Sequence, residues 1–320
     1  MEKYNKKKAG NQVMTEFSSD YVSAKMQKRI TECGDWLRFM ADKPIEKRKL
    51  TAANFCKWRF CPMCAWRKAV RDTACIDVMM QHINKTYRKE FIFLSLTAPN
   101  VPAEQLRDEV TRYNRAFKTL IKRKEVEGMN FGFIRKLEIT YNPERHDYHP
   151  HLHIVFAVNR GYFSGGRYVK QQQWLELWRE VMKDPSITQV DVRRVKRRND
   201  SREMSESFAV AEFAKYAAKD ADYTHDVEVF RAFYTALKGR QTLSFGGLFK
   251  EAVDLYKNDK LKEYIKEDAT EYYWNLVYEW GGSEYAQREK TPLDAVDRFF
   301  LEKRGLYVDD EIPDLFDEGE

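Results

Sequence analysis

The alternation of apolar and polar residues along the chain predicts a sheet with helices packed on it. Short apolar runs rich in β-branched and aromatic residues, ended by Pro, Gly or Asn, are typical of strands. Apolar residues at three- and four-residue spacing indicate amphipathic helices. Strands are expected at 91–97, 131–141, 149–158, 187–195 and 269–280, and helices at 65–87, 106–121, 171–183, 205–223 and 291–305. This pattern predicts an α+β fold with a central, mainly antiparallel sheet of five strands.

Three of the six histidines, His149, His151 and His153, open one of the predicted strands. Side chains alternate between the two faces of a strand, so these three imidazoles share a face. Two imidazoles spaced by two residues can hold one divalent metal ion. If the preceding strand pairs with this one, its acid Glu138 is the preferred third ligand, with His149 and His146 as competitors. The alternative is a row of polar residues on the wet face of a half-buried strand.

Four cysteines, Cys33, Cys56, Cys61 and Cys64, precede the first predicted long helix. A Cys-x-x-Cys loop with Pro62 inside it is typical of a zinc knuckle, because the tight turn aims two thiolates at one point. The four cysteines complete a tetrahedral set, and the fifth cysteine falls on the following helix. A catalytic redox pair is the weaker alternative, because the strand–helix context of such enzymes is missing.

The charge distribution favours an acidic partner, nucleic acid first. Net charge is +6, yet residues 309–320 carry seven acids and no base, so the rest of the chain carries +13. A basic body attracts a polyanion, although charged residues also simply solvate a surface. DNA contacts are expected from basic residues beside the cysteines and after the strand 187–195, namely Arg59, Arg67, Lys68, Arg193, Arg194, Lys196, Arg197 and Arg198.

Targeting signals are not expected in this chain. The basic, polar residues 1–30 predict a mobile arm that leads into a short helix, with no apolar run of a signal peptide. No apolar segment is long enough to cross a bilayer. We therefore expect a cytoplasmic protein without a membrane partner, whose cysteines are reduced.

The predicted helix 205–223 carries a second group of reactive side chains. Glu212, Tyr216, Lys219 and Tyr223 fall together on one face, apart from its apolar stripe. Acid, phenol and ammonium on one side of a helix could serve phosphotransfer. They could equally be the polar boundary of an ordinary amphipathic helix, which this helix alone favours.

The combination of these motifs resembles a known family. His-Pro-His-Leu-His at 149–153 followed by Glu-Phe-Ala-Lys-Tyr-Ala-Ala-Lys at 212–219 resembles the HUH endonucleases, and more narrowly the plasmid rolling-circle replication initiators of Gram-positive bacteria. The resemblance includes the cysteine region and Leu-Lys-Gly-Arg at 237–240, so it spans about residues 33–250. It implies an HUH fold related to the RRM sheet.

The resemblance also implies an enzyme that nicks one strand of a plasmid origin. In that family the two histidines hold a divalent metal, which here maps to His151 and His153, with Mg²⁺ or Mn²⁺ as the expected ion. Tyr216 would attack the phosphate, keep the 5′ end covalently and free a 3′-hydroxyl. Glu212 would activate water for the last cut, and Lys219 could pair with the phosphate.

The expected partners are plasmid origin DNA and the host helicase and polymerase. We expect three parts: a basic arm with the zinc element at 1–88, the catalytic domain at 89–250, and an extension with an acidic tail at 251–320. The alternatives are an HUH relaxase or tyrosine transposase, which share the histidines and tyrosine but not the cysteines. A further alternative of another class is a zinc-containing DNA-binding protein without catalytic activity.

Overall fold

The computed structural model describes residues 1–320 except for 167, 196–219, 266–267, 296 and 298–320. The chain forms two compact units, one of Met1–Lys68 with Lys266–Gly319 and the other of Ala69–Ile265. The helix α3 (Pro62–Tyr87) begins in the first unit and continues in the second. The division into three parts expected from the sequence stays a prediction.

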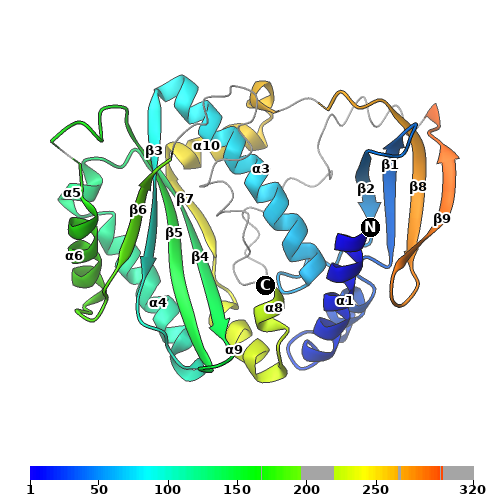
Figure 1. The fold of residues 1–320 in the computed structure, drawn as a ribbon, viewed down its shortest axis with the longest axis horizontal. Coiled ribbons are helices and arrows are strands. Elements are labelled where there is room, and N and C mark those ends of the chain that lie inside the picture. Colours follow the sequence, from blue (N-terminus) through cyan, green and yellow to red (C-terminus); the bar gives the residue numbers. More distant parts are fainter. Residues whose placement is uncertain (167, 196–219, 266–267, 296, 298–320) are drawn as a thin grey trace. The chain divides into compact units, whose positions relative to one another are not determined.

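The second unit is built on a five-stranded antiparallel sheet, the predicted architecture, but one edge strand is formed by residues 243–247 and not by the predicted strand 269–280. Its strand order is β6-β3-β5-β4-β7, and every neighbouring pair is antiparallel. Figure 1 shows β5 at the centre of the sheet, with β3 and β4 on its two sides. The strands are β3 (Lys89–Thr97), β4 (Gly132–Asn142), β5 (Asp147–Asn159), β6 (Val190–Arg194) and β7 (Leu243–Gly247).

Two helices, α4 (Ala103–Leu120) and α6 (Gln171–Met182), cover one face of this sheet. Phe156 of β5 stacks on Trp174 of α6, with ring centroids 6.0 Å apart. Tyr113 of α4 donates a hydrogen bond of 2.8 Å to the carbonyl of Pro150. The even-numbered residues of β5 thus form the core, as the alternation predicts, and the odd-numbered histidines lie on the opposite face.

The end of β7 requires glycine. Gly247 has φ of +55°, and a Cβ there would lie 2.4 Å from the carbonyl oxygen of Phe131. Gly247 therefore lets β7 end against β4 and α10 (Leu248–Lys257) begin at once. Phe249 of α10 packs on Phe91, on the same face of the sheet as the histidines. The remaining elements of this unit are α5 (Lys124–Glu127), α8 (Asp220–Tyr223), α9 (Val227–Leu237) and η2 (Lys262–Tyr264).

The first unit contains a second sheet, in which the predicted strand 269–280 pairs with strands that the sequence patterns did not reveal. Its order is β2-β1-β8-β9, so strands from the two ends of the chain pair with one another. Phe39 of β1 and Tyr278 of β8 pack edge to face, and Tyr4 packs on the same Phe39. The strands are β1 (Trp36–Asp42), β2 (Arg48–Ala53), β8 (Tyr272–Trp280) and β9 (Tyr285–Pro292).

Two predictions for this unit are wrong. The expected mobile arm is the helix α1 (Glu2–Phe17), followed by α2 (Ala24–Thr31), because Lys8, Asn11 and Met14 of α1 are buried. The helix predicted at 291–305 does not begin at Pro292, because the first described helical residue after β9 is Ala295. Thr291 and Pro292 end β9, where Pro292 lies opposite Trp274 of β8, and proline is tolerated at a strand end on a sheet edge.

Candidate metal sites

The first candidate site lies on the β4–β5 hairpin, which places an acid beside two histidines. The strand register sets Glu138 directly opposite His151, and Lys136 directly opposite His153. Directly opposed side chains on one face of an antiparallel pair lie about 5 Å apart at Cβ. Glu138 and His153 are buried and His151 is half-buried, so this part of the sheet face is not the wet surface of the alternative interpretation.

The three side chains converge on one point. The Nε2 atom of His153 lies 2.9 Å from Oε2 of Glu138, and Nε2 of His151 lies 3.2 Å from the same oxygen. Octahedral ligands held at 2.1 Å from a metal are separated by about 3.0 Å. The spacing of these donor atoms therefore fits a divalent cation as well as it fits hydrogen bonds. Imidazole with carboxylate is a donor set that suits first-row divalent metals.

Hydrogen bonds on the far side of each ring fix the orientation of the imidazoles. Ser95 Oγ of β3 lies 3.0 Å from Nδ1 of His153, and the carbonyl of His149 lies 3.2 Å from Nδ1 of His151. Phe93 stacks on the ring of His153, with centroids 5.4 Å apart. Partners of this kind hold metal-binding histidines with Nε2 toward the ion. Nothing in the sequence pattern distinguished Ser95 from any other strand serine.

The electrostatics of the cluster favour a carboxylate at Glu138. Burial opposes its ionisation, but the hydrogen bonds and charges of His151 and His153 outweigh burial and hold the pKa of Glu138 well below its usual range. Burial lowers the pKa of His149, and the neighbouring His151 lowers it further. A carboxylate flanked by two imidazoles is the state that can accept a cation.

The two competitors for the third ligand position lie apart from this cluster. Nδ1 of His146 lies 2.9 Å from the hydroxyl of Tyr141, on the hairpin turn. His149 contacts the ring of His151, but its carbonyl rather than its imidazole supports the site. Among the described residues, the potential ligand atoms that gather here belong to Glu138, His151 and His153. Their role as metal ligands stays a prediction.

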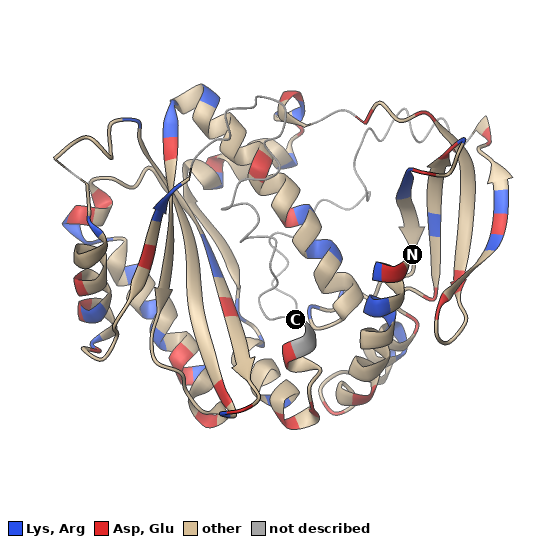
Figure 2. Ribbon diagram, in the orientation of Figure 1, with Lys and Arg blue, Asp and Glu red and all other residues tan. Residues whose placement is uncertain are grey.

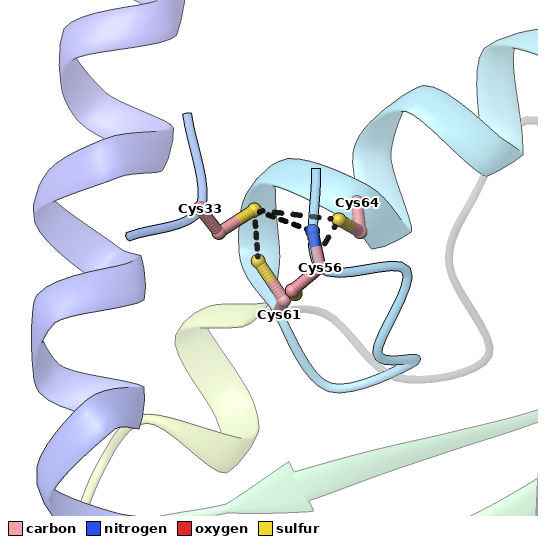
Figure 3. Close-up of side chains that lie close together, drawn as sticks. All are labelled: Cys33, Cys56, Cys61 and Cys64. Atoms are coloured by element: carbon pink, nitrogen blue, oxygen red, sulfur yellow. Dashed lines mark hydrogen bonds between the residues drawn. The ribbon is translucent and has the colours of Figure 1, made fainter. Parts of the chain in front are cut away.

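The second candidate site gathers Cys33, Cys56, Cys61 and Cys64, all in the first unit (Figure 3). The Sγ atom of Cys33 lies 3.5 Å from that of Cys64 and 3.6 Å from that of Cys61, and Cys56 lies 3.6 Å from Cys64. Four sulfurs at 2.3 Å from a tetrahedral zinc ion are about 3.8 Å apart. The spacing of the sulfurs therefore fits zinc. Cys75 is buried elsewhere, on α3.

Backbone and side-chain N–H groups point at these sulfurs. The backbone N–H of Cys56 donates to Sγ of Cys33 at 3.3 Å, and that of Lys57 donates to Sγ of Cys64 at 3.2 Å. Asn11 of α1 donates through Nδ2 to Sγ of Cys61 at 3.4 Å. Such donors stabilise negative sulfur. Burial and then the neighbouring thiols raise the pKa of Cys61 far above its usual value, so four thiolates here need a cation.

The predicted catalytic residues Tyr216, Glu212 and Lys219 lie outside the described residues. Tyr223, the second tyrosine on the helix face predicted to carry Tyr216, is described, and it is only 2% exposed, with its ring packed on Phe233. A buried phenol is a poor candidate for attack on DNA.

The predicted DNA contacts have mixed environments. Arg59, Arg67 and Lys68 are half-buried, and the guanidinium of Arg67 stacks on Phe55 at 3.7 Å. Arg193 and Arg194 of β6 are exposed, but Arg193 pairs with Asp191 and Arg194 with Glu90, each at 2.7 Å. Lys196, Arg197 and Arg198 lie outside the described residues. The DNA contacts of this set stay a prediction.

The fold and the two clusters define an α+β protein with one cysteine site and one histidine–carboxylate site. The chain belongs to the plasmid rolling-circle replication initiators, because the family described as "Replication protein" matches residues 47–286. A Staphylococcus aureus protein named "Protein rep" is 48% identical over 224 residues, which cover 70% of this chain and 95% of that relative. A Bacillus amyloliquefaciens "Protein rep" is 38% identical over 71% of this chain and 72% of its own length.

No solved structure matches this chain. Among the described residues, no helix is both long enough and apolar enough to span a bilayer.

Proposed function

We propose that this initiator is an HUH-type nuclease that nicks one strand of a plasmid double-strand origin. The observation that carries the proposal is the convergence of two imidazole nitrogens and one carboxylate oxygen within 3.2 Å on the β4–β5 hairpin. Family membership supplies the substrate class, since replication initiators act on origin DNA.

We assign a divalent metal, Mg²⁺ or Mn²⁺, to Glu138, His151 and His153. When bound, such an ion polarises the scissile phosphate and offsets the charge that develops on its oxygens. Ser95 and the carbonyl of His149 keep both Nε2 atoms directed at the site. These two hydrogen-bond partners hold the ligands in place before DNA arrives, so less reorganisation is needed during the reaction.

Tyr216 is the proposed nucleophile. Its hydroxyl oxygen attacks phosphorus, its proton is lost, and the bond from phosphorus to the 3′-oxygen breaks. The 5′ end is then held as a phosphotyrosyl ester, and the released 3′-oxygen takes up a proton to become the primer for the host polymerase. Because the ester conserves the energy of the broken bond, strand joining needs no nucleotide. Lys219 would pair with the phosphate, and Glu212 would accept a proton from water in the terminating hydrolysis.

The four cysteines are proposed to hold structural zinc. Closed sets of four protein ligands leave no position for substrate, so this site would stabilise the first unit rather than take part in the reaction. Host helicase and polymerase are the proposed partners after nicking.

Covalent capture of DNA tests the nicking proposal. The purified protein is incubated with Mn²⁺ and an origin oligonucleotide that is labelled on the 3′ side of the nick, then digested with protease. A nuclease leaves a peptide on the new 5′ end of the labelled fragment, whereas a DNA-binding protein without activity leaves none. Tyr216→Phe should remove the adduct, and Tyr223→Phe is the matched control that should keep it. An adduct that persists in Tyr216→Phe contradicts the assignment.

A further inference from the structure

Two arginines lie close together on the α4 side of the sheet in the second unit, opposite the histidine site. Arg240, in the loop between α9 and β7, donates to the carbonyl of Arg107 at 3.3 Å and to the hydroxyl of Thr111 at 2.8 Å. On the same side of the sheet, the buried Arg135 of β4 donates through its guanidinium to the side-chain oxygens of Asn114 and Ser244. We call Arg107 and Arg240 the arginine cluster.

The neighbouring Arg135 donates its hydrogen bonds to neutral groups. Arg135 is only 7% exposed, and within the described part of the chain it forms no ion pair; its third acceptor is the carbonyl of Gln241 at 3.4 Å. Burial lowers the pKa of Arg135 to about 10. Burial and then Arg107 lower the pKa of Arg240, while Asp108 raises it. The charges of Arg107 and Arg240 therefore repel one another; Asp108 offsets part of this repulsion, and a bound anion would offset more of it.

Further cations extend the cluster along α4. Arg107, Arg115 and Lys118 are exposed and follow one face of the helix over about 16 Å, and Lys238 lies beside Arg240 in the loop. We call Arg107, Arg115 and Lys118 the basic stripe. None of the three forms an ion pair with a carboxylate among the residues that the structure describes. By contrast, Arg112 on another side of α4 pairs with Glu109 and Asp184. Lys and Arg recur along α4 in Figure 2.

The position of these groups indicates which form of DNA they fit. The helix α4 covers the face of the sheet opposite His151 and His153. The nucleotides that are bound at the histidine site therefore cannot also contact the α4 side. Single-stranded DNA is usually held by aromatic stacking platforms. The exposed large apolar side chains of the described residues include no aromatic residue of α4. A row of cations without such a platform suits the regular phosphates of a duplex.

We propose that the arginine cluster and the basic stripe bind the phosphate backbone of duplex DNA that flanks the nick site. The proposal rests on the proposed function only in taking origin DNA as the substrate. It adds a second binding surface for DNA, formed by α4 and the loop 238–242, which is separate from the surface where the strand is cut.

Salt dependence of duplex binding tests this proposal. Each lost phosphate contact lowers the slope of log affinity against log salt concentration by about 0.9. With the full-length protein and a short duplex of arbitrary sequence, Arg107→Gln/Arg240→Gln should lower the slope by about 1.8, and Arg115→Gln by about 0.9. Arg231→Gln is the matched control, because Arg231 already pairs with Glu228 at 2.9 Å. It should change the slope less than Arg115→Gln does.

Two further measurements identify the ligand and exclude a merely structural role for these arginines. Arg240→Lys keeps the charge and should retain most of the slope; a loss equal to that of Arg240→Gln would overturn the proposal. An unchanged slope in Arg115→Gln and in the double variant would overturn it as well. So would a loss confined to a single-stranded probe of the same length. Nicking of a single-stranded oligonucleotide is measured separately. If the wild type fails to nick while the duplex slopes fall as expected, only the proposed nuclease function fails.

Discussion

The two candidate metal sites differ in how the fold brings their ligands together. Glu138, His151 and His153 lie on one hairpin, and a single strand register places them. Cys33 follows α2 and Cys64 lies in the first turn of α3, and side chains of α1 contact Cys33 and Cys61. Lys8 of α1 is 1% exposed and donates to the carbonyls of Thr31 and Cys33 and to Asp35. The histidine site is a local product of one sheet, whereas the cysteine site joins several elements.

This difference predicts different roles for the two sites in stability and in activity. A site formed by a continuous sheet keeps its geometry without an ion, because the backbone ladder already holds its ligands. A site whose ligands come from separate segments depends on the ion to hold those segments together. We therefore expect loss of the cysteine site to unfold structure, and loss of the histidine site to remove activity while the fold persists.

The largest effect is expected from loss of the proposed zinc ion. Structural zinc contributes about 10–16 kcal/mol in small metal-dependent domains, as much as the whole stability of many domains. Cys61→Ser, or a strong chelator, should therefore release the zinc and unfold the first unit. Metal analysis and thermal unfolding of the purified protein measure both outcomes.

Cys75→Ala is the control for this experiment, because Cys75 is also buried but belongs to no cysteine group. It should retain one zinc ion per chain and most of the thermal stability. A Cys61→Ser protein with unchanged zinc content and melting temperature would refute a structural role for the cluster.

His153→Gln should separate activity from folding at the other site. The amide preserves most of the side-chain volume and polarity but is a poor metal ligand, so nicking should fall by more than about 100-fold. The melting temperature should change little compared with that of Cys61→Ser. Single-turnover nicking with Mn²⁺ and thermal unfolding on the same preparation give the comparison. Unfolding of the His153→Gln protein would contradict the expectation that the histidine site serves activity and not stability.

The same difference explains what could be predicted from the sequence. The residues of the histidine site could be proposed because strand alternation and one hairpin bring Glu138 to His151. Four strands of the five-stranded sheet were predictable for the same local reason, but β7 was not, and the predicted strand 269–280 is β8 of the other sheet. The pairing of β1 with β8 was not, because it joins Phe39 to Leu276 across most of the chain and no local pattern specifies that register.

The helix α1 shows a second limit of hydropathy patterns. Its lysines and asparagine indicated a solvated arm, yet Lys8 and Asn11 are buried because their N–H groups satisfy carbonyls and a sulfur around the cysteines. A polar side chain with all its donors satisfied can be buried at little net cost. A hydropathy pattern does not show which buried polar groups are hydrogen-bonded. Ser95 was missed for a similar reason, since its importance depends on which ring lies next to it.

Ser95→Ala should have a smaller effect at the histidine site than loss of a ligand. The imidazole of His153 would lose the hydroxyl that orients Nδ1, and loss of a hydrogen-bond partner of a metal-binding histidine typically costs about 10- to 100-fold in metal affinity. Titration of Mn²⁺ against single-turnover nicking measures this loss. Ser95→Thr keeps the hydroxyl and should stay close to the wild type. Equal losses in the Ala and Thr variants would indicate a packing effect instead.

Asn11→Ala should produce the smallest effect and tests the fastening of the cysteine site by α1. The change removes the donor to Cys61 Sγ and leaves the carbonyl of Ile30, which accepts from the same amide at 3.0 Å, without this partner. Loss of one such buried donor costs about 1–2 kcal/mol of unfolding free energy, so zinc content should stay at the wild-type level while denaturant stability falls. Thr15→Ala, whose hydroxyl bonds only to the helix carbonyl of Asn11, is the matched control on α1. If Asn11→Ala and Thr15→Ala lower stability equally, α1 contributes as a helix and not through its contact with the sulfur. A faster release of zinc to a chelator in Asn11→Ala alone would show that a site assembled from separate segments depends on side chains outside its ligand set.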